Sequence, residues 1–147
     1  MKGQVSTELL VIVALVLLIF IPLLVLVYFK ANEANQQIAS YQAELSVSRI
    51  ASLANSVGSL GTDTSVTTDV FVPPNTLEFK ANPIGNRGGE IVMRMETPQG
   101  PTEIVEVVKY PITQADLADA STAGGWIRVK VSSTYSAGQA KIDIEKV

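Results

Sequence analysis

The chain has 147 residues, with 11 basic and 14 acidic side chains and a formal net charge of -3. It has no cluster of Lys and Arg that could neutralise a row of phosphates, so nucleic acid is not an expected partner. Cys and His are both absent, which excludes thiol nucleophiles, disulfides and the usual zinc sites. We therefore expect no metal, no cofactor and no enzyme activity.

A long apolar run begins at Leu9 and ends at Phe29, and it contains no charged residue. At about 1.5 Å per helical residue it reaches about 30 Å, the hydrocarbon thickness of a bilayer. The run is too long for a secretory signal, whose apolar region has about 7 to 15 residues. Pro22 lies inside it, and such a proline is tolerated in lipid or among packed helices. The run predicts a segment that enters a membrane, and a plain membrane anchor is one interpretation.

Glu8 stands immediately before this run. A carboxylate near the centre of a bilayer costs roughly 2.5 to 3.5 kcal/mol, and less near the interface. The ordinary explanation is an acid in the first turn of a helix, where the positive end of the helix dipole contributes about 0.3 to 1 kcal/mol. Taken alone, Glu8 does not distinguish an anchor from any other membrane helix.

The residues around Glu8 carry a family resemblance. The stretch KGQVSTELL, followed directly by the apolar run, resembles the N-terminus of archaeal type IV pilins with a class III signal peptide. In that family a prepilin peptidase removes a short basic leader on the cytoplasmic side. The resemblance implies that residues 1–3 are the leader, that the cut falls between Gly3 and Gln4, and that Glu8 becomes the fifth residue of the mature chain.

Each residue at the cut then has an expected role. Lys2 would hold the leader in the cytoplasm, and Gly3 would let the backbone lie extended in the protease. Cleavage exposes an ammonium on Gln4, about one helical turn from Glu8. A buried carboxylate needs such a partner, so this pair is expected to set the register of an assembling subunit. The flagellin-type pattern is not found after the cut, which favours an adhesive pilus over a motility filament.

Extraction from lipid would favour packing of the run against its copies. In the bilayer the helix gains little from such contacts, whereas in water each fully buried Leu, Ile or Val contributes about 1.5 to 3 kcal/mol. The resemblance implies a homopolymeric filament, assembled by an ATPase with a membrane platform. The expected filament core comprises Leu9, Leu10, Val13, Leu17, Phe20, Leu24 and Val27.

An amphipathic stripe continues beyond the run, and a single helix is predicted over residues 4–60, with residues 9–29 as its membrane or filament part. The helix is expected to stop at the pair Gly58 and Gly61. No flexible spacer follows the run, although anchored ectodomains often have one. A coiled-coil stalk is the alternative, and a phase shift within the stripe disfavours it. The stripe comprises Ala31, Ala34, Ile38, Tyr41 and Leu45, and then Ile50, Leu53, Val57 and Leu60.

From Ser65 onward the apolar pattern has a period of two, which is typical of strands. Six strands separated by Pro and Gly turns predict a small antiparallel β-sandwich-like head over residues 62–147, and hence an α+β fold. The stretches SVTTDVFV, NTLEFKA and TEIVEVVKY are three of these strands. The other three bury Ile91, Met93 and Met95; Ile127, Val129 and Val131; and Ala140, Ile142 and Ile144.

Between Tyr110 and Trp126, the polar stretch TQADLADA predicts a short helix. Its two aspartates, Asp116 and Asp119, are expected to lie on a solvated face and not to form a catalytic pair. Trp126 and Tyr135 could stack on a sugar, but a single Trp at the start of a strand predicts a core position. The loops of this excursion and residues 82–89 are the expected variable surface.

The resemblance thus implies a pilin that is first inserted in the membrane and then forms an extracellular adhesive pilus on the cell surface. The alternative is an uncleaved, membrane-anchored cell-surface ectodomain that binds a ligand or a partner protein.

Overall fold

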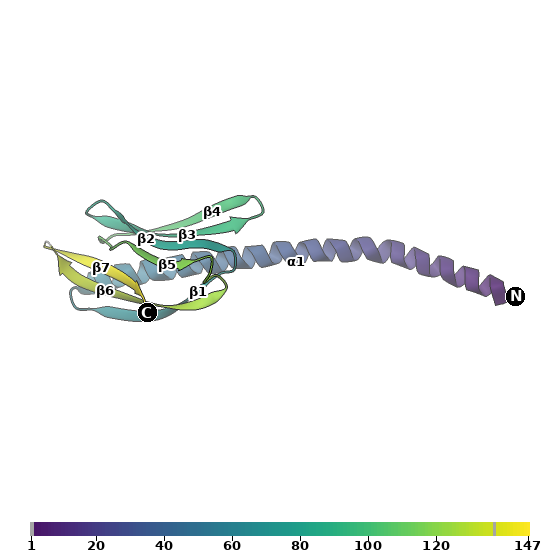
Figure 1. Ribbon diagram of the computed structural model, residues 1–147, viewed down its shortest axis with the longest axis horizontal. Helices are drawn as coiled ribbons and strands as arrows, with labels where there is room; N and C mark the ends of the chain where they lie inside the picture. The colour runs from purple at the N-terminus through teal and green to yellow at the C-terminus, as the bar shows by residue number, and fades with distance from the viewer. Residues whose placement is uncertain (1, 137) are drawn as a thin grey trace. The chain divides into compact units, whose positions relative to one another are not determined.

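The computed structural model describes residues 2–136 and 138–147, with side chains described from residue 6 to 135 and from 138 onward. One helix precedes all the strands (Figure 1), so the predicted α+β class is confirmed. The described part of the chain has seven strands, one more than predicted. The elements are α1 (Lys2–Leu60), β1 (Ser65–Val72), β2 (Thr76–Ile84), β3 (Gly88–Thr97), β4 (Gly100–Val108), β5 (Ala115–Asp119), β6 (Gly125–Ser136) and β7 (Gln139–Lys146).

The strands form two antiparallel sheets. One has three strands in the order β1-β6-β7, and the other has four in the order β4-β3-β2-β5. A parallel bridge from Ile112 to Ile142 joins the segment after β4 to the three-stranded sheet. Buried residues of both sheets and of the last turns of α1 belong to one hydrophobic cluster. In Figure 1 these turns of α1 pass between the two sheets.

The alternating strands bury the residues that their pattern predicts. Ile91, Met93 and Met95 on β3 are almost fully buried, and so are Val129 and Val131 on β6. Ile142 and Ile144 on β7 are buried as well, while Ala140 is half-buried. Because successive side chains of a strand point to opposite faces, the residues between them face the solvent. These three strand predictions are confirmed.

The C-terminal part of α1 belongs to the head. Residues 1–37 and 38–147 form two compact units, and in the second unit Ala43, Val47 and Ile50 of α1 are fully buried. The second compact unit therefore contains the last turns of α1 together with residues 62–147, the range predicted for the β-rich head. The helix supplies a strip of the core that covers apolar side chains from both sheets.

The face of α1 that the head buries differs from the predicted stripe. Ile38, Tyr41 and Leu45 are 53%, 65% and 70% exposed, so the first half of the stripe does not pack in the head. In its second half Ile50 and Val57 are buried, whereas Leu60 is exposed. The buried face consists largely of small residues, because a helix with sheets on both sides has little room for large side chains. It comprises Ala39, Ala43, Ser46, Val47, Ile50, Ala51, Ala54 and Val57.

Helix α1 ends at Leu60, close to the predicted stop. Gly61 follows with a φ of 96°, a left-handed conformation that glycine adopts without strain. Gly58 is still helical, and a Cβ at this position would lie 2.6 Å from Cγ of Tyr110. The segment after β4 is also tied to α1 because the backbone N–H of Lys109 donates a hydrogen bond to Asn55 Oδ1 at 2.8 Å.

The predicted helix at TQADLADA is wrong, because this segment contains strand β5. It pairs with β2, which otherwise has an open edge, through pairs such as Ala81 with Ala115 and Lys80 with Asp116. Leu117 and Ala118 are both buried, since the register shifts between Phe79 and Lys80. Tertiary pairing has overridden the local preference for a helix.

Candidate functional site

The seven residues predicted as filament core all lie on the first unit of the chain and are all exposed. Their exposed fractions range from 49% at Val13 to 68% at Leu10. By length and composition, α1 is the one helix among the described residues that is long and apolar enough to cross a membrane, and the rest of the chain buries none of its most apolar stretch. This surface is stable only in lipid or against other protein.

Pro22 does not interrupt the helix. Helix α1 is continuous from Lys2 to Leu60 with Pro22 inside it. A proline has no backbone N–H and removes one hydrogen bond from the helical ladder. The continuous helix agrees with the expectation that this defect is tolerated.

Glu8 lies in the second turn of α1, because the helix begins at Lys2 and has no acidic residue in its first turn. The effect of the helix dipole falls off within the first turn, so in the uncleaved chain it acts less on Glu8 than on a first-turn acid. The side chain is exposed, and no residue within the described ranges forms an ion pair with it.

The side chains of Lys2, Gly3 and Gln4 lie outside the described residues, so their predicted roles stay predictions. Their backbone belongs to α1. A protease that needs an extended chain would have to unwind this turn, and glycine is among the residues that most weaken a helix.

The polar end of the apolar run carries an ion pair. Lys30 Nζ lies 2.7 Å from Glu33 Oε2, one turn further along α1. This hydrogen bond and the opposite charges lower the pKa of Glu33 and raise the pKa of Lys30. Both side chains are exposed, so the pair adds little to stability. Its position marks where the membrane-length surface ends.

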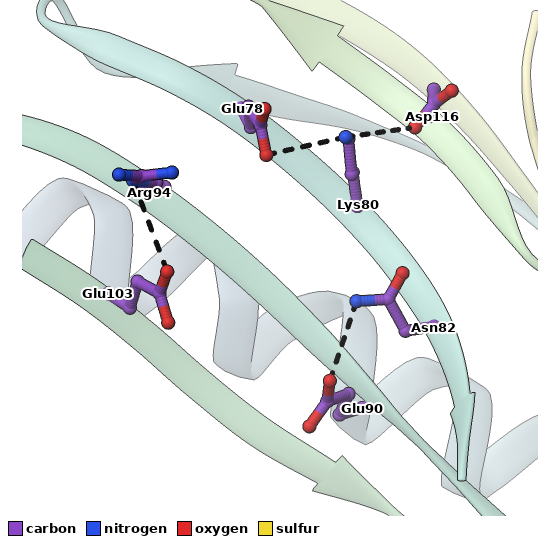
Figure 2. A network of polar contacts seen from close by, with 7 residues as sticks. All are labelled: Glu78, Lys80, Asn82, Glu90, Arg94, Glu103 and Asp116. Atoms are coloured by element: carbon purple, nitrogen blue, oxygen red, sulfur yellow. Dashed lines mark hydrogen bonds and ion pairs between the residues drawn. The ribbon is translucent and has the colours of Figure 1, made fainter.

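Figure 2 shows polar contacts on the four-stranded sheet. Lys80 Nζ lies 3.3 Å from Glu78 Oε2 and 3.9 Å from Asp116 Oδ1, which joins β2 to β5. Exposed pairs of this kind contribute at most about 1 kcal/mol each. The remaining contacts join Arg94 to Glu103 at 4.0 Å and Asn82 to Glu90 at 3.4 Å.

The two aspartates of the predicted excursion have separate roles. Asp116 faces Lys80, whereas Asp119 Oδ1 accepts hydrogen bonds from the backbone and hydroxyl of Ser121 and from the backbone of Thr122. These bonds lower the pKa of Asp119 and hold the turn between β5 and β6. Among the described residues, no group of three carboxylates lies close enough to hold a metal ion.

Trp126 was predicted in the core, and this prediction is wrong because the side chain is 69% exposed. It lies on β6 beside Phe71 of β1, with ring centroids 5.4 Å apart. Tyr135 is at the other end of β6, where its hydroxyl donates a hydrogen bond to the carbonyl of Gly138. The structure therefore does not bring the two aromatic residues together as one sugar platform.

Comparison of the chain with protein-family models, with curated proteins and with solved structures finds no match.

Proposed function

We propose that this chain is the structural subunit of an archaeal type IV-like adhesive pilus, and that residues 4–60 polymerise into the filament core. One observation carries the proposal: a single helix both exposes the membrane-length apolar run and supplies part of the core of the head. No loop separates the two parts of α1. A subunit of this design can bury the run in a bundle of copies while its head faces outward.

The gain from polymerisation is large. The seven exposed side chains assigned to the filament core would contribute about 10 to 20 kcal/mol, before entropic costs, if neighbouring helices covered them fully. In the bilayer the same contacts add little, because lipid already covers these side chains. Assembly therefore needs machinery that extracts the helix, and we assign this role to an ATPase with a membrane platform.

Cleavage before Gln4 would complete the assembly site. The exposed Glu8 has no ion-pair partner within the described part of the chain, and loss of residues 1–3 by a prepilin peptidase would create an ammonium one turn away. In the filament core both charges would be buried, and each would need the other. The partner ammonium can belong to the same copy or to the next one.

A second candidate function is a membrane-anchored ectodomain that binds a ligand or a partner. The length of the apolar run, which matches a bilayer, favours it equally. This candidate requires an intact N-terminus, and it assigns no special role to Glu8. The two candidates therefore differ in what they predict for a change at this residue.

Replacing Glu8 tests the proposal. In the native host, Glu8→Leu is expected to insert in the membrane and to lose its leader, but to lower the yield of sheared filaments about tenfold or more, because the ammonium of Gln4 would be buried without a partner. The yield is measured by electron microscopy and by quantifying the subunit. Glu33→Gln, a change on the same helix beyond the run, is the matched control. Filaments of Glu8→Leu at the wild-type level would refute the role of Glu8 in assembly.

A further inference from the structure

Three large apolar side chains of α1 are exposed on the head, and we call them the α1 ridge: Ile38, Tyr41 and Leu45. Their spacing of three and four residues places them on one line along the helix. The same spacing continues towards the N-terminus through Ala34 and Ala31 to Val27. Each side of the α1 ridge borders a groove of the head, and the two grooves differ in charge.

The first groove lies between α1 and β4 and has a volume of about 400 Å³. We call it the acidic flank; it is lined by Tyr41 and Glu44 of α1 and by Ile104 and Glu106 of β4. Ile104 packs on the core and Glu106 follows two residues later, so both face α1. Neither Glu44 nor Glu106 forms an ion pair with another described residue.

The second groove lies between α1 and the end of β1 and has a volume of about 340 Å³. We call it the basic flank; it is lined by Leu45 and Arg49 of α1, by Phe71 and by Trp126. Leu45 and Trp126 are 70% and 69% exposed, so they form a protruding apolar edge.

The charge beside this edge is positive. Arg128 Nε donates a hydrogen bond to Asp69 Oδ1 at 2.8 Å, and this bond, together with the charge of Arg49, lowers the pKa of Asp69. Arg128 is thus paired with Asp69, whereas Arg49, which lines the groove, forms no ion pair with another described residue. One positive charge remains next to the exposed Trp126.

We propose that the basic flank of one head docks on the acidic flank of a second copy of this chain. The flanks are complementary in charge, and each carries exposed apolar side chains that the contact would bury. Contact between two acidic or two basic flanks would place like charges together, which is unfavourable. The inference rests on the proposed function, because it names the partner that the filament would bring to each head.

This contact uses a different surface on each of the two copies. Such a heterologous contact leaves one free flank at each end of an assembly, and it produces an open helical filament when the rotation between copies does not close a ring. The two flanks border the same α1 ridge. Stacked heads would therefore place the ridges of successive copies at a common interface.

Disulfide trapping in full-length filaments tests the contact. The chain has no Cys, so every disulfide must come from introduced residues. Gln42→Cys on the basic flank and Thr102→Cys on the acidic flank leave the charged and large apolar side chains in place. After mild oxidation, filaments of the double variant are expected to give a ladder of covalent multimers, at least tenfold above either single variant. The matched control combines Gln42→Cys with Gln114→Cys, an exposed position outside both flanks, and is expected to give no ladder.

Three results would overturn the inference: intact filaments of the double variant without a ladder, covalent dimers from either single variant, or an equal ladder in the control. If wild-type cells make no filament of this chain, the proposed function fails and the inference fails with it. If the double variant does not assemble, charge reversal decides. Arg49→Glu and Glu106→Arg should each lower filament yield and together restore it, and no recovery in the combined variant counts against the contact.

Discussion

Single residues in this chain act through neighbours that are distant in sequence. Gly58 was expected to help end α1, but it lies within the helix and beneath the ring of Tyr110. The exposed Trp126 was expected in the core. In both cases the residue type alone suggested the wrong environment for the side chain. The actual environment is set by the residue that packs against it. The partner Tyr110 lies in the segment after β4, and the partner Phe71 lies on β1.

At Gly58 the effect of packing and the effect of helix propensity have opposite signs. Ala in the middle of a helix is normally about 0.5 to 1 kcal/mol more stable than Gly. Here a Cβ would overlap the ring of Tyr110, so Gly58→Ala is expected to lower the free energy of unfolding of the head by about 1 to 3 kcal/mol. Denaturant unfolding of residues 38–147 measures this change. In the Tyr110→Ala background, which removes the ring, the same substitution should cost much less, and a stabilising Gly58→Ala in the wild-type background would contradict the packing.

At the scale of elements, α1 is shared between two parts of the chain. Residues 1–37 form one compact unit, and the rest of the helix belongs to the head. Its buried face covers apolar side chains of both sheets, which form one cluster with it. The two sheets therefore share the helix as a part of their common core.

Two fragments test the contribution of the helix to this core. Residues 38–147 are expected to be monomeric and to unfold cooperatively, because they contain all of the buried core. Residues 62–147 are expected to aggregate or to unfold without cooperativity, since they lack Val47, Ile50 and the other buried residues of α1. Size-exclusion chromatography and denaturant unfolding distinguish the two. A cooperative, monomeric 62–147 fragment would show that the sheets are stable without the helix.

Much of the fold could be predicted from periodicity. The alternating strands, the length of α1 and its end near Gly61 follow from local patterns that the structure confirms. Strand β5 could not be predicted this way, because its polar residues gain a partner only from the open edge of β2. The buried face of α1 was missed for a related reason. Alanine gives a weak hydrophobic signal, and only the tertiary contacts show that Ala43 and Ala54 are in the core.

At the scale of the whole molecule, the chain carries apolar surfaces that it does not cover itself. The run at residues 9–29 is exposed, and the α1 ridge adds a second exposed surface on the head. The run was evident from sequence because its residues are consecutive. The two flanks were not, since Glu44 and Glu106, or Arg49 and Trp126, come together only through the packing of α1 against two sheets. The apolar run and the α1 ridge with its flanks would both be covered if further copies of the chain packed against them.

The mass of the native subunit tests the central claim most directly. If the chain is processed and polymerised as proposed, the protein recovered from sheared surface filaments begins at Gln4 and lacks the mass of the first three residues. Intact mass spectrometry with N-terminal sequencing measures this. A cell-surface protein that begins at Met1, with none beginning at Gln4, would contradict the account and support an uncleaved membrane anchor.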